Sequence, residues 1–234
     1  LIGVNGEVEA VTGITRDVTE RKRVEERALF LTELMGRLTP LYREKDIVSS
    51  TVEALGKHLN ASRCYFVECH PDEDRITIAN AWSAPGQKDN SGTFPLHDFA
   101  DTQLWQKVET GAVMVEDVEK DPRTAPALER FHEFGIRSWA SHPFKESGKR
   151  TVTLAVAFSE PHQWLPWEAS LLDHVIARVW PLVGRARSEA ALRESRRRLR
   201  MVSDHVPALI GYVDQDEVFQ FANGRYTEWF GLTT

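Results

Sequence analysis

The sequence predicts an α+β fold, with an antiparallel sheet in the middle of the chain and a long helix on each side of it. Two pairs of alternating apolar segments, 64–69 with 76–82 and 136–144 with 151–158, are each joined by a short polar turn. This pattern is typical of antiparallel strands. Apolar residues at helical spacing lie mainly before residue 60 and after residue 166.

The first part of the chain predicts a hairpin followed by a helix. Residues 1–15 read as a β-hairpin with a tight turn at Asn5-Gly6, and a helix is expected over 20–42. Its apolar residues alternate in steps of four and three, as in a heptad repeat. Two interpretations stay open, because the helix can pack on its own domain or form a parallel dimer. The heptad seam contains Val24, Ala28, Leu31, Met35, Leu38 and Tyr42, and a second apolar stripe contains Phe30, Leu34 and Leu41.

The central region predicts alternating short helices and strands. Asp46 is expected to cap a helix that ends near residue 60. The segment 85–91 is rich in Gly, Asn, Asp and Lys, which predicts a loop. The remaining elements between the two strand pairs are expected to be a helix at 102–110, a strand at 113–118 and a helix at 127–134.

A second long helix is expected to begin near Pro166. Pro181 lies inside it and predicts a kink or break, because proline lacks an amide hydrogen and clashes with the carbonyl of Ala177. After about Met201 the helical pattern fades, and 209–213 with 218–222 predicts another hairpin. The helix continues the four-three spacing with Leu172, Ile176, Val179, Val183, Ala186 and Ala190, of which Ile176, Val179 and Val183 are assigned to a dimer interface.

Charge and composition narrow the class of protein. The net charge is −6, and the acidic excess lies between residues 41 and 180, which argues against a nucleic-acid-binding domain. The arginines of 193–200 have glutamates four residues earlier at two positions, as is usual on a solvated helix face. The longest apolar run, 152–158, is too short for a membrane span. Two cysteines, predicted to lie on opposite faces of one strand, indicate a cytoplasmic protein, and we expect the chain to be part of a longer one.

The region 33–187 resembles a GAF domain. The residues that carry the resemblance occur in the order typical of that family: 61–66, then 111–118 with Asp121-Pro122-Arg123, then Gly135-Ile136-Arg137-Ser138-Trp139 with Pro143, then Trp164 with 168–172. The resemblance implies a mostly antiparallel six-stranded sheet, with a helical bundle on one face and a ligand pocket on the other.

Both ends of the chain resemble parts of PAS domains. Residues 1–19 look like the last two strands of one PAS domain, and 205–234 look like the start of another. The helix over 188–204 looks like the connector of bacterial sensor kinases and cyclases. The resemblance implies a sensory GAF module of a signalling protein that dimerises and relays a signal through its long helices to output domains. A structural spacer without a ligand is one alternative, and a haem- or thiol-based redox sensor is another. We expect no enzymatic activity in this fragment.

Strand parity predicts which residues face the pocket. Along 151–158 the bulky residues alternate with small ones, and the small face leaves space for a ligand. By resemblance to phytochrome-type GAF domains, Tyr65 and Val67 on one strand and Trp139 and Ser141 on another point into the same space. Trp105 and Leu128 could form its roof. Alternatively, Tyr65 and Trp139 fill the space themselves. The predicted pocket contains Tyr65, Val67, Trp105, Leu128, Trp139, Ser141, Thr153, Ala155 and Ala157.

The identity of a ligand stays open at this point. The segment 124–134, where related bilin-binding domains carry a cysteine, contains none, which argues against a covalently bound bilin. The acidic pair typical of cyclic-nucleotide GAF domains is missing after Phe131. His97 or His132 could ligate haem, although a surface role is the simpler interpretation. Methionine-sulfoxide reductase chemistry needs neighbouring thiols, which the two cysteines do not provide. No metal-binding motif is present in the sequence.

Overall fold

The computed structural model describes residues 19–100, 102–146 and 150–231. The hairpin predicted at 1–15 lies outside these residues. A sheet of six strands in the order β3-β2-β1-β6-β5-β4 forms the centre of the molecule, and neighbouring strands are antiparallel throughout. Its strands are β1 (Arg63–His70), β2 (Arg75–Ser83), β3 (Gly92–Pro95), β4 (Val113–Val115), β5 (Ser138–Glu146) and β6 (Arg150–Phe158).

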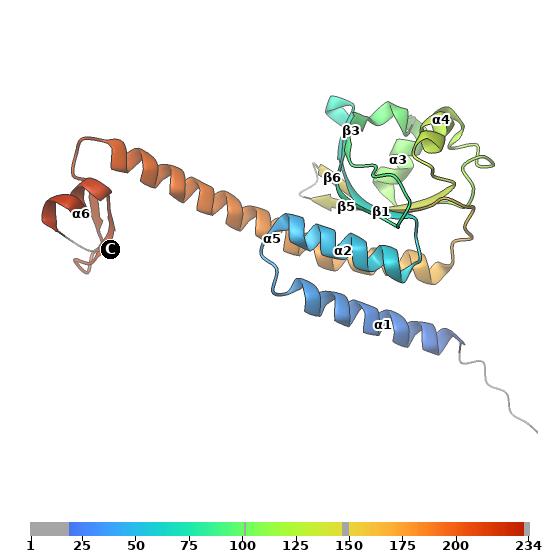
Figure 1. Cartoon of the computed structure of the whole chain (residues 1–234), viewed down its shortest axis with the longest axis horizontal. Coiled ribbons are helices and arrows are strands. Elements are labelled where there is room, and N and C mark those ends of the chain that lie inside the picture. Colours follow the sequence, from blue (N-terminus) through green and yellow to red (C-terminus); the bar gives the residue numbers. More distant parts are fainter. Residues whose placement is uncertain (1–18, 101, 147–149, 232–234) are drawn as a thin grey trace, which may run out of the picture.

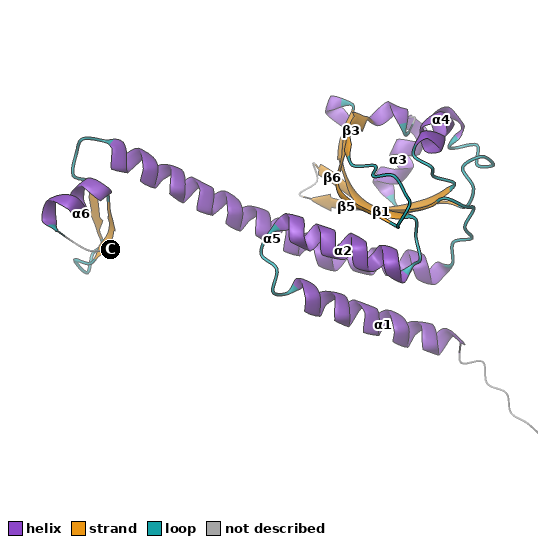
Figure 2. Cartoon of the chain, in the orientation of Figure 1, coloured by secondary structure: helices purple, strands orange, loops and turns teal. Residues whose placement is uncertain are grey.

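Helices cover both faces of this sheet (Figure 1). On one face lie α2 (Glu44–His58) and the first half of α5 (Pro166–His205), and α1 (Thr19–Leu38) packs against them on the side away from the sheet. On the other face lie α3 (Thr102–Thr110) and α4 (Leu128–Glu133), with loops between them. The predicted α+β class and the six-stranded antiparallel sheet are confirmed (Figure 2).

The sheet separates two hydrophobic cores. On β6, Val152, Leu154 and Val156 face α2 and α5, whereas Ala155 and Ala157 belong to the core under α3 and α4. The two cysteines follow the same rule, because Cys64 lies in the first core and Cys69 in the second. Both are buried and free, as their predicted positions on opposite faces require.

The first helix is shorter than predicted and only partly forms the expected seam. It ends at Leu38, because Pro40 disfavours helical backbone at the residue before it. Leu31 and Leu38 are buried against the chain's own core together with Phe30 and Leu34. Val24 and Ala28 are exposed, Met35 is half-buried, and Tyr42 lies beyond the helix. Leu31 and Leu38 are therefore corrected to core residues of one chain, whereas a dimer contact through Val24, Ala28 and Met35 stays a prediction.

The second long helix is also corrected in two respects. It runs from Pro166 to His205 without a break at Pro181, whose neighbours Val179, Trp180 and Val183 are buried and hold both sides of the proline in place. Ile176, Val179 and Val183, which were assigned to a dimer interface, are at most 1% exposed and belong to the core of one chain. Residues 190–202 of the same helix are exposed on every side.

A small C-terminal unit follows α5. It contains the hairpin of β7 (Gly211–Val213) and β8 (Phe219–Ala222), and then α6 (Gly224–Phe230). Asp214 forms the turn by accepting hydrogen bonds from the amides of Asp216 and Val218, at 3.0 Å each. The buried Asn223 ties the unit to the end of α5 through the carbonyl of Ser203, at 2.8 Å. The predicted hairpin is therefore present in the structure.

Candidate functional site

An apolar cavity of about 90 Å³ lies between the sheet and the segments that cover its α3 side. Its floor comes from β1, β2, β5 and β6, and its roof from α3, α4 and residues 96–100. The floor residues belong to one hydrophobic core, and the sheet separates this core from the one that contains the helical layer on its other face. The lining residues are Tyr65, Val67, Cys69, Ile76, Ile78, Leu96, Phe99, Ala100, Trp105, Val108, Phe131, Ile136, Trp139, Ser141, Thr153 and Ala155.

The register of the strands explains why there is space above the sheet. Tyr65 of β1 and Ser141 of β5 are both directly opposite Ala155 of β6, so one methyl group lies between them in this row. In the next row Thr153 pairs with Val67. Small side chains on β6 therefore leave a hollow that is bounded by larger side chains on the neighbouring strands.

Aromatic side chains form much of the cavity wall. Phe131 of α4 stacks on Trp139 of β5 with ring centroids 5.9 Å apart. Trp105 of α3 and Phe99 contribute to the roof. The ion pair between Arg130 and Asp98 joins α4 to the segment that carries Phe99. The roof is thus a set of short elements that depend on a few contacts, whereas the floor is a continuous sheet.

The polar groups of the cavity are few and uncharged. Among the described residues, the indole N–H of Trp139 is buried without a hydrogen-bond partner. Tyr65, Ser141 and Thr153 bring hydroxyl groups to the lining, and all three residues are buried. Burial raises the pKa of the Tyr65 hydroxyl to about 12 and that of the Cys69 thiol to about 12. Both groups are therefore neutral at physiological pH.

Most of the predicted pocket residues meet in this cavity. Tyr65, Val67, Trp105, Trp139, Ser141, Thr153 and Ala155 line it. Leu128 and Ala157 belong to the same core but do not reach the cavity, so these two assignments are corrected. Ala157 is directly opposite Trp139, one row away from the hollow, and Leu128 lies at the start of α4.

Several lining residues were not predicted. Cys69 has the same parity as Tyr65 and Val67, and Ile76 and Ile78 alternate in the same way on β2, so strand parity could have identified all three. Phe99 gives no such signal, because it lies in an irregular segment. Its position depends on tertiary contacts with Phe94 and Phe134, at centroid distances of 5.8 and 5.3 Å.

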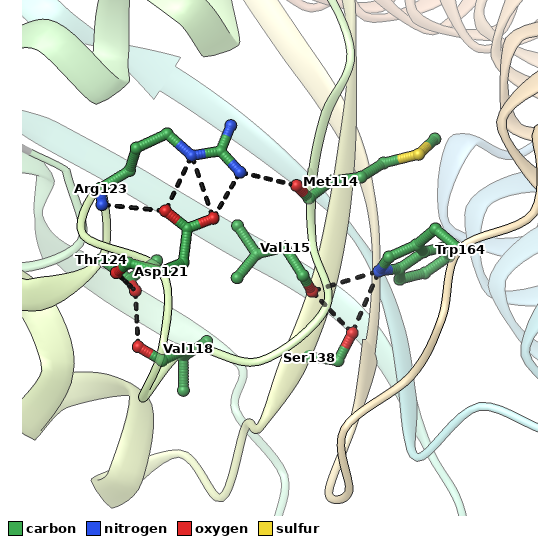
Figure 3. A network of polar contacts seen from close by, with 8 residues as sticks. All are labelled: Met114, Val115, Val118, Asp121, Arg123, Thr124, Ser138 and Trp164. Atoms are coloured by element: carbon green, nitrogen blue, oxygen red, sulfur yellow. Dashed lines mark hydrogen bonds and ion pairs between the residues drawn. The ribbon is translucent and has the colours of Figure 1, made fainter.

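The Asp121-Pro122-Arg123 motif has a structural role beside the cavity (Figure 3). The guanidinium of Arg123 donates to both carboxylate oxygens of Asp121 and also to the carbonyl of Met114 on β4, at 2.9 Å. The guanidinium holds the pKa of the Asp121 carboxyl below its usual range. Thr124 donates to the carbonyl of Val118, at 2.6 Å. The motif therefore fastens the loop after β4 to this edge strand.

A second group of hydrogen bonds lies at the same edge of the sheet. The indole N–H of Trp164 donates to the carbonyl of Val115 at 3.2 Å and to the hydroxyl of Ser138 at 3.0 Å, as Figure 3 shows. Ser138 also donates to Val115, at 2.7 Å. Because Trp164 comes just before α5, these bonds connect the start of the long helix to the edge of the sheet.

An ion-pair cluster connects the other side of the sheet to α5. Arg187 contacts the carboxylates of Glu68 on β1 and Glu44 at the start of α2, and its guanidinium lies 5.0 Å from the ring centroid of Trp180. Glu68 lies between Val67 and Cys69, which both line the cavity. One strand thus contacts the cavity on one face and the long helix on the other.

Other candidate chemistry finds no support in the arrangement of side chains. Within the described residues, no three His, Cys, Asp or Glu side chains are grouped so that they could hold a metal ion. His97 contacts Asp74 and His132 contacts Glu119, both on the surface, and neither lines the cavity. Among the described helices, none combines the length and apolar character that a membrane span requires.

Solved structures with the same fold come from several kinds of protein. The phycoerythrobilin-bound GAF domain of a cyanobacterial phytochrome is 15% identical, with a TM-score of 0.59, over 70% of this chain and 97% of that one. Free methionine-R-sulfoxide reductase from Neisseria meningitidis, in complex with its substrate, is 16% identical, with a TM-score of 0.57, over 78% and 99%. The GAF domain of a phosphoenolpyruvate-protein phosphotransferase from Acinetobacter is 14% identical, with a TM-score of 0.56, over 71% and 98%.

At these levels of identity the likeness concerns the fold alone. A search of curated proteins gives no significant match. The family model for the GAF domain matches residues 44–180, which is more than half of the chain. This range begins at α2, contains the whole six-stranded sheet and ends inside α5. The chain therefore belongs to the GAF domain family.

Proposed function

We propose that this chain is a sensory module that binds a small molecule in the cavity over β1, β5 and β6 and passes the bound state to α5. The observation that carries the proposal is the position of β1 between the cavity and the helical layer. Val67 and Cys69 line the cavity, and Glu68 between them contacts Arg187. A ligand that shifts β1 changes this contact, which lies just before the exposed half of α5.

The proposal places the module in a bacterial signalling protein of the cytoplasm. The C-terminal unit of β7, β8 and α6 supports a second, PAS-type domain after α5, and the output domain would be a histidine kinase or a cyclase. Two buried, free thiols fit a reducing compartment. The exposed half of α5, 190–202, supports homodimerisation through this segment rather than through the buried residues of the same helix.

A covalently bound bilin and a thiol enzyme are not part of the proposal. The cavity of about 90 Å³ is well below the roughly 300–1,000 Å³ of sites for larger ligands, and 124–134 contains no cysteine. Cys69 lines the cavity, but burial raises its pKa to about 12, so the thiolate that attachment or catalysis needs is scarce. Cys64 lies on the opposite face of the sheet and cannot act as its partner.

The alternative is a spacer whose cavity holds no ligand. The small volume favours it, because the large side chains of Tyr65 and Trp139 both line the space and take up part of it. In this case the sheet and helices would serve only to hold neighbouring domains at a fixed distance.

Native mass spectrometry of freshly purified protein separates the two functions. The sensory function predicts a dimer that carries extra mass from a small molecule, or that gains such mass when incubated with a ligand library. The spacer predicts the bare polypeptide mass under all these conditions, and this outcome would refute the sensory proposal. An absorbance spectrum of the same sample reports any bilin or haem, and bilin absorbance that persists after denaturation would contradict the argument from volume and cysteine position.

A further inference from the structure

The cavity differs from a general small-molecule site in the chemistry of its walls. Besides aliphatic side chains and Cys69, its described lining contains aromatic and hydroxyl-bearing ones. These are Tyr65, Phe99, Trp105, Phe131, Trp139, Ser141 and Thr153. None of the described lining residues is Asp, Glu, Lys, Arg or His. A ligand with a net charge would lose its hydration without gaining an opposite charge.

Two arginines close to the cavity, Arg130 and Arg63, already have partners. Arg130 at the roof contacts Asp98 and Glu133. Arg63, at the end of β1, donates to the carbonyls of Gly135 and Lys88, at 3.1 and 3.3 Å. Recruiting either guanidinium for an anionic ligand would break contacts that hold the roof or the adjacent loop in place.

The volume sets the size of the occupant. An engineered apolar cavity of about 150 Å³ in another protein binds benzene or xenon. The present cavity of about 90 Å³ is smaller, so a single six-membered ring is the upper limit unless the roof moves.

One buried polar atom indicates how a ligand would be oriented in the cavity. The indole N–H of Trp139 has no partner among the described residues, and an unmet donor in an apolar environment is costly. A hydrogen-bond acceptor on the ligand would satisfy it, and the hydroxyls of Ser141 and Thr153 offer further polar contacts on the same floor.

We infer that the cavity takes an uncharged, single-ring molecule that carries a hydrogen-bond acceptor for the indole N–H of Trp139. The inference rests on the proposed sensory function and names its class of ligand. Anions, zwitterionic amino acids and extended cofactors are excluded from the cavity in this conformation.

Titration of the whole chain with isosteric probes tests the inference. Benzene and pyridine have nearly the same shape, but at pH 8 only pyridine offers an acceptor. We expect both to bind and pyridine to shift the Trp139 indole resonance strongly in a ¹H–¹⁵N NMR spectrum. The charge requirement is tested by toluene against N-methylpyridinium and by nitrobenzene against benzoate, and we expect only the neutral member of each pair to bind.

Two variants isolate the hydrogen bond. Trp139→Phe should reduce the preference for pyridine over benzene by about fivefold, since one hydrogen bond is lost while the shape change affects both probes alike. Trp167→Phe is the matched control, because its indole N–H is also unpartnered but the side chain packs in the helical core. The control should keep the wild-type preference. If Trp139→Phe does not fold, the indole shift in the wild-type protein still decides the question.

The outcomes separate the inference from the proposed function. Binding of the charged probes as tightly as of their neutral partners would overturn the inference and leave a ligand-binding cavity. Equal response of the Trp139 resonance to benzene and pyridine would also overturn it. Failure of every probe to bind would refute both the inference and the ligand site on which the sensory function depends.

Discussion

Asp121 and Arg123 are a pair whose sequence pattern is typical of the family and whose contacts are structural. Arg123 donates to both oxygens of Asp121, at 2.9 and 3.0 Å, and the same guanidinium contacts the carbonyl of Met114. One arginine therefore provides hydrogen-bond donors both for a carbonyl of the edge strand and for the carboxylate in the loop beside it. Neither residue lines the cavity.

We expect Asp121→Asn to remove a pH-dependent part of the stability. Arg123 holds the pKa of Asp121 below its usual range, so the pair stabilises the fold above the unfolded-state pKa of about 4. This contribution is lost as the pH falls through the lower pKa of the folded state. Because the pair is partly exposed, the difference from wild type at pH 7 should be about 1 kcal/mol or less.

Urea unfolding at pH 7 and at pH 3 measures this effect. The gap in unfolding free energy between wild type and Asp121→Asn should narrow at the lower pH. Arg123→Leu should remove the same pH-dependent part, although it also loses the bond to Met114. A gap that stays constant from pH 7 to pH 3 would show that the carboxylate does not stabilise the loop.

Among the elements, α5 departs most from its sequence pattern. Pro181 removes one backbone hydrogen bond, yet the helix continues, because Val179, Trp180 and Val183 are buried on one side while the proline itself is exposed. Burial of a large apolar side chain contributes about 1.5–3 kcal/mol, so the three together outweigh the cost of one proline, about 3 kcal/mol.

Pro181→Ala should therefore stabilise the chain. Alanine restores the amide that can donate to Ala177 and removes the clash with that carbonyl, without changing the buried face. We expect the unfolding free energy to rise by about 1–3 kcal/mol in chemical denaturation. Glu189→Ala, further along the helix, serves as a control and should change the stability little, because Glu189 makes exposed ion pairs with Arg185 and Arg193. A decrease in stability for Pro181→Ala would mean that the packed helix requires proline geometry.

The strands of the central sheet could be predicted well from the sequence, whereas the partners of the helices could not. Alternation on β1 and β6 identifies both faces, so the floor of the cavity follows from parity. The heptad spacing of α1 and α5 is equally compatible with a second chain and with the helical layer of one chain. Only the structure shows that Leu31 and Val183 face their own core. The strand β3 and the roof residue Phe99 lie in segments whose position depends on distant contacts rather than on local pattern.

At the scale of the whole molecule, Arg187 connects β1, whose opposite face lines the cavity, to α5 just before its exposed half. Arg187→Gln would leave Glu44 and Glu68 close together without the cation that both contact. We expect a loss of about 2 kcal/mol in stability. Hydrogen exchange should become faster in α5 around residue 187 and in β1. Arg185→Gln is the matched control, since Arg185 is exposed and pairs with Glu189 of the same helix. Equal effects of the two variants would contradict the role of Arg187 as the connection.

The exposed half of α5 is where a second copy of the chain is expected to bind. Leu192, Leu199 and Val202 lie on one side of the helix with heptad spacing, and they are 52%, 68% and 61% exposed. A helical segment with solvent on every side is marginally stable alone, and pairing of two such stripes would bury them.

Leu199→Asp places a charge in this stripe and should convert a dimer to a monomer in sedimentation velocity. Met201→Asp is the control, because Met201 lies on the opposite side of the helix and is also exposed. Substitutions at Leu31 or Leu38 cannot serve this purpose, since both side chains are buried in the core of one chain and their loss would unfold it. If Leu199→Asp remains dimeric while Met201→Asp dissociates, the interface lies on the other side of α5, and a dimer in both variants would place it elsewhere in the molecule.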